Sequence, residues 1–347
     1  MRGLPPILPV DEEIRAAALA ELDRKTKPRG SLGRLEELAA QIAAVHGSAA
    51  PDALRPAIVV AAADHGVAAE GVSAYPQEVT HQMLENFAAG GAAISVLARH
   101  LGAVLHVVDA GVVEPCADPI VRSLRLGPGT ANAAHGPAMS REQASEAIAR
   151  GVSLARELGD AGANVVALGD MGIGNTTSSA ALAGALLGRA PADMCGPGTG
   201  LDAAGVAHKV SVVERMLAAN PSAGADPLQA LAAVGGFEIG LLAGVALGAA
   251  AGRAVVVLDG FITSVAALVA TRLEPELGGY LVASHRSPEP GHAAVLDALA
   301  LDPLLELGLR LGEASGAALA LPLLEAARAI LVEMATFEAA GVTDTGR

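Results

Sequence analysis

Short, continuous runs of apolar residues recur along the chain and alternate with longer stretches of helical periodicity. Five such runs predict buried strands at residues 57–63, 104–108, 164–168, 254–258 and 280–283. Helical spacing predicts helices at about 11–24, 33–46, 76–100, 140–158, 177–188, 203–219, 226–234, 238–251, 262–271, 291–299 and 322–340. Strands that are apolar throughout and alternate with helices indicate a parallel sheet covered on both faces. The pattern therefore predicts an α/β domain at residues 49–324, with residues 1–48 and 325–347 forming a small helical bundle.

Polar side chains follow the carboxyl ends of all five predicted strands. They are Asp64, His65, Asp109, Asp170, Asp259, Ser284 and His285. A single aspartate at such a position is often only a helix cap. Because ligands of open α/β sheets bind along this edge, the repetition across five strands predicts that these groups converge on one crevice.

The strand at 164–168 runs into a glycine-rich turn, GDMGIGNTT at residues 169–177. Glycines let backbone N–H groups approach an anion, hydroxyls add donors, and the following helix start contributes partial positive charge. The spacing matches neither a Walker motif nor the dinucleotide fingerprint. A phosphate site and an ordinary capped turn therefore both remain open.

Composition and charge narrow the class of protein. The net charge of −14 argues against a nucleic-acid partner and requires local donors for any phosphate ligand. Two cysteines, Cys116 and Cys195, fit a reducing compartment. The amino-terminal residues lack the apolar region of a signal peptide, and the most membrane-like run, 239–252, is too short to span a bilayer. We expect a soluble, cytoplasmic protein without a membrane span.

Glu313 is the single acid in an Ala/Leu/Gly-rich stretch at residues 307–324. A lone glutamate on a helix usually faces solvent. Here its neighbours offer little polar surface, and a buried carboxylate with a raised pKa could act as a general base near neutral pH. The basic turn at residues 25–33 has two interpretations as well. It is either a solvated helix connection or an arm that reaches a phosphate, in its own subunit or in a neighbouring one.

Nine short motifs follow one another along most of the chain. They are KPRGSLG (27–33), ADHGV (63–67), GVSAYPQEVT (71–80), GDMGIGNTT (169–177), GPGTGLD (196–202), GGFEI (235–239), LDGF (258–261), SHRS (284–287) and LGE (311–313). In this order, over about residues 25 to 325, they resemble the nicotinate-nucleotide–dimethylbenzimidazole phosphoribosyltransferases of the cobalamin lower-ligand pathway.

The resemblance implies a reaction and an architecture. The family transfers the ribose phosphate of nicotinate mononucleotide to a nitrogen of 5,6-dimethylbenzimidazole, with inversion at the anomeric carbon, and yields α-ribazole 5′-phosphate and nicotinate. A Rossmann-like large domain, a small helical domain built from both chain ends, and a homodimer are also implied. The family uses no metal ion and no organic cofactor.

The resemblance also implies roles for individual residues. Glu313 matches the catalytic carboxylate that takes the azole proton. Asp170 stands where the family is expected to carry a glutamate, so its role as a second base or as a water-mediated ribose ligand is open. The residues implied in phosphate and ribose binding are Gly172, Gly174, Asn175, Thr176, Thr177, Lys209 and Asp259. The residues implied in binding the acceptor base are Ser73, Pro76, Gln77, Leu311 and Ser287. His81 falls in the same segment without an assigned role.

Three alternatives remain. Asp64, His65, Asp109, Asp259 and His285 could bind a divalent metal in a hydrolase. The fold could serve a nucleotide-binding sensor, which has no need for a buried base. The same transferase chemistry could use another acceptor, such as adenine, another benzimidazole or a phenol.

Overall fold

The computed structural model describes residues 6–198 and 200–343. Within them, six strands form one sheet: β1 (Pro56–Ala63), β2 (Val104–Gly111), β3 (Val121–Ser123), β4 (Val165–Met171), β5 (Val255–Leu258) and β6 (Leu281–Ala283). The strand order is β3-β2-β1-β4-β5-β6, and every neighbouring pair is parallel. Strand order reverses direction between β1 and β4, which is the point where doubly wound folds bind ligands. The predicted α/β, Rossmann-like fold is confirmed.

Helices cover both faces of the sheet, which explains why β1 is buried along nearly its whole length. On one face, α5 and α10 pack on each other, and α10 contacts four of the strands. On the other face, α4 packs on α13. The α-helices are α1 (Glu12–Arg24), α2 (Arg34–His46), α3 (Val79–Ala88), α4 (Ala93–Leu101), α5 (Arg141–Asp160), α6 (Asn175–Leu187), α7 (Pro191–Met194), α8 (Ala203–Ala219), α9 (Pro227–Val234), α10 (Phe237–Ala251), α11 (Phe261–Leu273), α12 (Pro290–Leu299), α13 (Ser315–Glu333) and α14 (Phe337–Ala340).

The contact between α5 and α10 depends on glycine. A Cβ atom on Gly151 would lie 2.0 Å from the carbonyl oxygen of Leu241, and one on Gly244 would lie 2.0 Å from that of Ile148. The two helix backbones therefore touch directly. This close approach explains how an Ala/Gly-rich chain without tryptophan brings its helix backbones together in the core.

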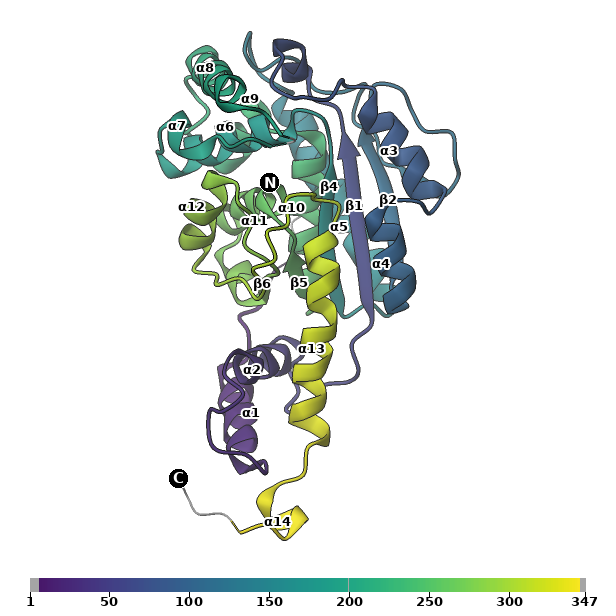
Figure 1. The fold of residues 1–347 in the computed structure, drawn as a ribbon, viewed down its shortest axis with the longest axis vertical. Coiled ribbons are helices and arrows are strands. Elements are labelled where there is room, and N and C mark those ends of the chain that lie inside the picture. The colour runs from purple at the N-terminus through teal and green to yellow at the C-terminus, as the bar shows by residue number, and fades with distance from the viewer. Residues whose placement is uncertain (1–5, 199, 344–347) are drawn as a thin grey trace.

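The two ends of the chain meet away from the sheet. Helices α1 and α2 pack on each other and on α13, which runs from the sheet down to them (Figure 1). Helix α13 is long and apolar enough to cross a membrane by length and composition, but 56% of its most apolar window is buried inside the protein, as in a core helix. The predicted domain boundary at residue 324 falls inside this helix. Residues 1–5 and 344–347 of the predicted small bundle lie outside the described residues.

The structure corrects several predicted elements. The helix predicted at 76–100 is two helices, because Gly90 and Gly91 interrupt it between α3 and α4. The helix predicted at 322–340 is instead the end of α13 followed by the separate short α14. Helix α13 begins at Ser315 and ends at Glu333, since burial of its first turns outweighs the cost of Pro322 in its interior. Strand β3 and the short α7 were not predicted, because each is too short to show a period. The run expected to be most membrane-like, 239–252, forms most of α10, which is buried from Phe237 to Ala250.

Candidate active site

A narrow cleft opens at the carboxyl ends of the central strands, on the predicted edge of the sheet. Its volume is ≈ 90 Å³. It is lined by Asp170, Met171, Gly172, Ile173, Asn175, Thr176, Gly198, Gly260, Phe261, Ile262, His285, Ser287, Glu289, Arg310, Leu311 and Gly312. The glycine-rich turn, the segment around Ser287 and the segment before α13 thus meet here. Of the seven polar groups expected to converge at this edge, Asp170 and His285 line the cleft.

The glycine-rich turn connects β4 to α6 and lies directly against the neighbouring strand. A Cβ atom on Gly172 would lie 2.4 Å from the carbonyl oxygen of Ala63, so no side chain fits there. Gly174 has φ +93° and is the N-cap of α6. Asn175 and Thr176 therefore open the helix, with its amino terminus facing the cleft, and these are the elements of an anion site.

Lys209 supplies a positive charge at this helix start. It projects from α8 and is fully buried. Its Nζ donates to Thr176 Oγ1 at 2.8 Å and to the carbonyl oxygen of Gly196 at 3.2 Å. Burial lowers the pKa of the Lys209 ammonium, and the charge of Glu289 opposes that shift. The arrangement suits an anion that would bind where Thr176 meets the cleft.

Glu289 closes the same side of the cleft and was not predicted from the sequence. Its Oε1 accepts a hydrogen bond from the backbone N–H of Gly198 at 2.7 Å, while Oε2 is buried without a hydrogen-bond partner. It thereby ties the GPGTGLD segment to the start of α12. Thr199 of that segment lies outside the described residues. Arg310, an exposed cation lining the cleft, was also missed.

Asp170 lies within β4 rather than beyond it, because the strand extends to Met171. Its Oδ2 accepts from Asn175 Nδ2 at 2.9 Å, and its Oδ1 is buried without a partner. Burial raises the pKa of the Asp170 carboxyl to about 7, and the nearby charge of Glu238 adds to the shift. Asp170 is thus a carboxyl group that titrates near neutrality inside the cleft.

Glu313 lies in the turn before α13 and not in a helix, which corrects the helical placement. Its φ of +63° is a left-handed conformation that only a few non-glycine residues adopt. Its N–H donates to the carbonyl oxygen of Asp170 at 3.2 Å, so the two acids are joined through the backbone. The side chain is 5% exposed, and Oε2 is buried without a partner. Burial alone raises the pKa of Glu313 to about 7.

Asp259 fixes the turn that carries Glu313. Its Oδ1 accepts from the N–H groups of Gly316 at 2.7 Å and Ala317 at 3.0 Å, at the start of α13. Burial raises its pKa well above the ordinary value, and the charge of Asp170 adds to the shift. Asp259 does not line the cleft itself, while His285 does.

The comparisons with known proteins bear on what this site does. The phosphoribosyltransferase family model matches residues 7–342. The chain belongs to this family. Nicotinate-nucleotide–dimethylbenzimidazole phosphoribosyltransferases are 55% identical in Azotobacter vinelandii, covering 98% of this chain and 97% of that protein, and 53% identical in Roseiflexus sp., covering 96% and 95%. The crystal structure of the Thermus thermophilus enzyme of the same name superposes with a TM-score of 0.91 at 48% identity, covering 96% of this chain and 99% of that one.

Family membership confirms that the chain is a phosphoribosyltransferase, as the nine motifs predict. The hydrolase and sensor alternatives are wrong. The five residues of the metal hypothesis also do not assemble: in the described parts of the chain, no three His, Cys, Asp or Glu side chains are placed to hold a metal ion. Asp109, for example, is paired with Arg125 at 2.7 Å instead.

Several residues predicted to bind substrate in this phosphoribosyltransferase do not line the cleft. Thr177 is fully buried behind the loop in α6. Ser73 and Pro76 are not among the residues that line the cleft, and Gln77 lines a second cleft of ≈ 330 Å³ beside Asp64 and His81. The segment at 71–80 therefore borders the site in this structure without entering the cleft.

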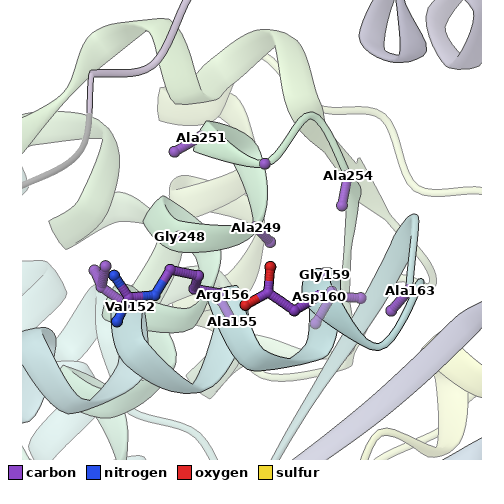
Figure 2. Close-up of a pocket in the computed structure, with 12 residues that line it drawn as sticks. Val152, Ala155, Arg156, Gly159, Asp160, Ala163, Gly248, Ala249, Ala251 and Ala254 are labelled. Carbon is purple, nitrogen blue, oxygen red and sulfur yellow. The ribbon is translucent and has the colours of Figure 1, made fainter.

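A larger cavity, ≈ 480 Å³, lies between the carboxyl ends of α5 and α10. Val166 near the start of β4 and Ala254 just before β5 line it, so it is at the opposite edge of the sheet from the cleft. Small side chains form most of its wall, and Arg156 and Asp160 are its charged members (Figure 2). Both are exposed, so this cavity lacks the buried polar groups that mark the cleft.

Proposed function

We propose that this enzyme transfers the phosphoribosyl group of nicotinate mononucleotide to 5,6-dimethylbenzimidazole, with Glu313 as the general base. The observation that carries the proposal is a buried carboxyl group with a pKa of about 7 and an unpartnered oxygen, next to an anion site at the start of α6. A base poised near the operating pH removes a proton most effectively. The relatives named above act on these substrates, which supports the same choice here.

The proposed step balances as a displacement. One ring nitrogen of the benzimidazole attacks the anomeric carbon, and the N–H proton of the other nitrogen passes to Glu313. Nicotinate leaves with the electron pair of the broken C–N bond, so the anomeric configuration inverts. Because the leaving group departs as a stable molecule, it needs no acid, metal ion or organic cofactor. Positioning in a water-poor cleft then supplies most of the acceleration.

The remaining roles follow from position. The 5′-phosphate would bind the loop through Gly172, Gly174, the N–H groups of α6, Thr176 and Lys209, while Asp170 and Asn175 would face the ribose. Leu311 and Ser287 would contact the acceptor base, and closure of the segment 71–80 would bring Ser73, Pro76 and Gln77 to it. Thr177 and Asp259 would support the loop and the turn that carries Glu313.

We also propose that the enzyme is a cytoplasmic homodimer acting in cobalamin nucleotide-loop assembly. The family resemblance supports the homodimer and the pathway, and the two cysteines fit a reducing compartment. Nucleic acid and membrane are not proposed as partners. The natural acceptor could be a different base, because an apolar pocket discriminates weakly between rings of similar size.

The test is to incubate purified protein with nicotinate mononucleotide and 5,6-dimethylbenzimidazole, without added metal, and to follow α-ribazole 5′-phosphate by chromatography. We expect product from the wild type and a large loss in Glu313→Ala. Glu306→Gln is the matched control, since Glu306 is an exposed acid of the same segment. Product from Glu313→Ala at the wild-type rate would refute the base and leave Asp170 to be tested next. No product from the wild type would refute the acceptor, and adenine and phenols would be tried.

A further inference from the structure

A buried histidine–glutamate pair lies beneath the cleft and has no part in the proposed reaction. His65 follows β1 and is fully buried, as is Glu238 in the first turn of α10. His65 Nε2 lies 2.7 Å from Glu238 Oε1, and His65 Nδ1 lies 2.9 Å from Ser178 Oγ in α6. One imidazole ring therefore joins three elements of the fold, and one of them is the helix whose amino terminus faces the cleft.

The imidazole ring is wedged under the glycine-rich turn. A Cβ atom on Gly172 would lie 3.4 Å from His65 Nε2, and one on Gly174 would lie 3.3 Å from His65 Cβ. On the other side, a Cβ atom on Gly236 would lie 2.4 Å from His65 Cε1. The ring thus fills the space between the anion loop and the start of α10. Any movement of His65 would be transmitted to the loop, because close-packed interiors transmit strain.

Several acids face this pair. Asp64 precedes His65 in the chain and Asp170 faces it from β4, and both favour the charged imidazole. Burial lowers the pKa of His65, but Glu238 and these acids outweigh it, so the pKa is raised. Asp170 is faced in turn by Glu238, by Glu313 from the turn before α13 and by Asp259 from the end of β5. Glu238 Oε2 has no partner.

We propose that the His65–Glu238 pair is a positioning device for the reaction: it holds the 172–175 loop from below and supplies the positive charge that lets Asp170 face the ribose as a carboxylate. The proposal rests on the transferase reaction proposed above. Neither residue touches the substrates. Both act through Asp170 and the loop.

The proposed reaction explains why an ionised Asp170 would be useful. When the C–N bond of nicotinate mononucleotide breaks, positive charge develops on the ribose ring, and a fixed carboxylate beside it stabilises the transition state. Alone, Glu238 would keep Asp170 protonated by repulsion between like charges. A protonated His65 neutralises the charge of Glu238. Asp170 can then ionise, and its carboxylate is the one uncompensated negative charge of this group.

Substitutions on the two sides of the pair should move the pH dependence in opposite directions. His65→Gln removes the positive charge that favours the Asp170 carboxylate. We therefore expect the acidic limb of the pH profile of kcat/KM to move up by about one pH unit. Glu238→Gln removes the repelling negative charge, and because Asp64 and Asp170 still favour the charged imidazole, the limb should move down. Ser178→Ala keeps the pair and loses one hydrogen bond to it, so KM for nicotinate mononucleotide should rise while the limb stays in place.

A purely structural role predicts something different, namely lower kcat with an unmoved limb, or shifts in the same direction for both variants. Either result would overturn the proposal. In an Asp170→Asn background, His65→Gln should no longer move the limb, and a persistent shift would show that the charge acts elsewhere. Glu238→Gln preserves size and hydrogen bonding, so the series stays informative if His65→Gln fails to fold.

The protonation state of the His65 ring can be measured by NMR without any activity assay. It therefore tests the role of the His65–Glu238 pair separately from the proposed reaction. In ¹⁵N-labelled protein, His65 assigned by its loss in His65→Gln should show two protonated ring nitrogens near neutral pH. A neutral ring there would refute the proposal even in an active enzyme. A charged ring in a protein that makes no product would refute the assigned substrates and leave the pair as the counter-charge of Asp170.

Discussion

Glu313 gives the sharpest test of how burial prepares the cleft, because a single substitution should improve stability while it removes activity. Glu313→Gln keeps the shape of a side chain that is 5% exposed and lacks a partner at Oε2. It changes the charge and little else. The left-handed backbone at this position is unchanged by the substitution, so its strain cancels in the comparison.

The magnitude follows from the raised pKa. Moving the Glu313 pKa from 4.5 to about 7 corresponds to about 3 kcal/mol that favours the protonated form in the folded state. Below about pH 4.5 the group is protonated in both folded and unfolded chains, so it costs nothing. Between 4.5 and about 7 the unfolded chain ionises first, and folding stability falls as pH rises. Above about pH 7 the cost stays near its full value.

We therefore expect Glu313→Gln to gain up to about 3 kcal/mol over the wild type between about pH 4.5 and about pH 8. Its activity should fall by about 10²- to 10⁴-fold, the usual contribution of a general base. Urea unfolding at both pH values measures the first quantity, and product formation measures the second. Activity of the wild type should decline below about pH 7 as Glu313 and Asp170 take up their protons.

The control is Glu306→Gln. The Glu306 side chain is 74% exposed and pairs with the exposed Arg286, so the stability difference for this variant should stay small at both pH values. If Glu313→Gln and the wild type lose stability in parallel as pH rises, burial does not hold a proton on Glu313. If the variant keeps its activity, the base lies elsewhere. The two results are independent, so each part of the reasoning can fail alone.

Three further substitutions test the anion loop and the core. Gly172→Ala should cost about 1–3 kcal/mol of stability and raise KM for nicotinate mononucleotide, while Gly136→Ala, with nothing within 4 Å, should change neither. Lys209→Met should raise that KM by about 10- to 100-fold through loss of a charged donor and leave KM for the base unchanged, and equal effects on both substrates would contradict a phosphate role. Arg125→Met leaves the buried carboxyl of Asp109 without its cation and should lower urea-measured stability by about 2–4 kcal/mol without changing activity per folded molecule.

The parts of the structure that were predictable from the sequence are those with a local cause. Five strands were found because each is a mostly apolar run that ends in a polar group, and the anion loop was found because glycines separate β4 from α6. The break between α3 and α4 also has a local cause, the pair Gly90–Gly91, and a stricter use of glycine as a helix breaker would have found it. Strand β3 has no such cause, because three residues carry no period.

The missed residues of the site have causes that lie far apart in the chain. Glu289 acts by binding the N–H of Gly198, 91 residues away, and His65 meets Glu238 across 173 residues. No periodicity or spacing links such pairs, and each acid taken alone looks like an ordinary residue at a helix start. Local rules fail here because buried carboxyls oppose folding, and the fold supplies Asn175 as the partner of Asp170 and His65 as the partner of Glu238. Acids that the local sequence pattern predicts to be exposed are thus buried at this site, and such residues indicate where the enzyme carries out its chemistry.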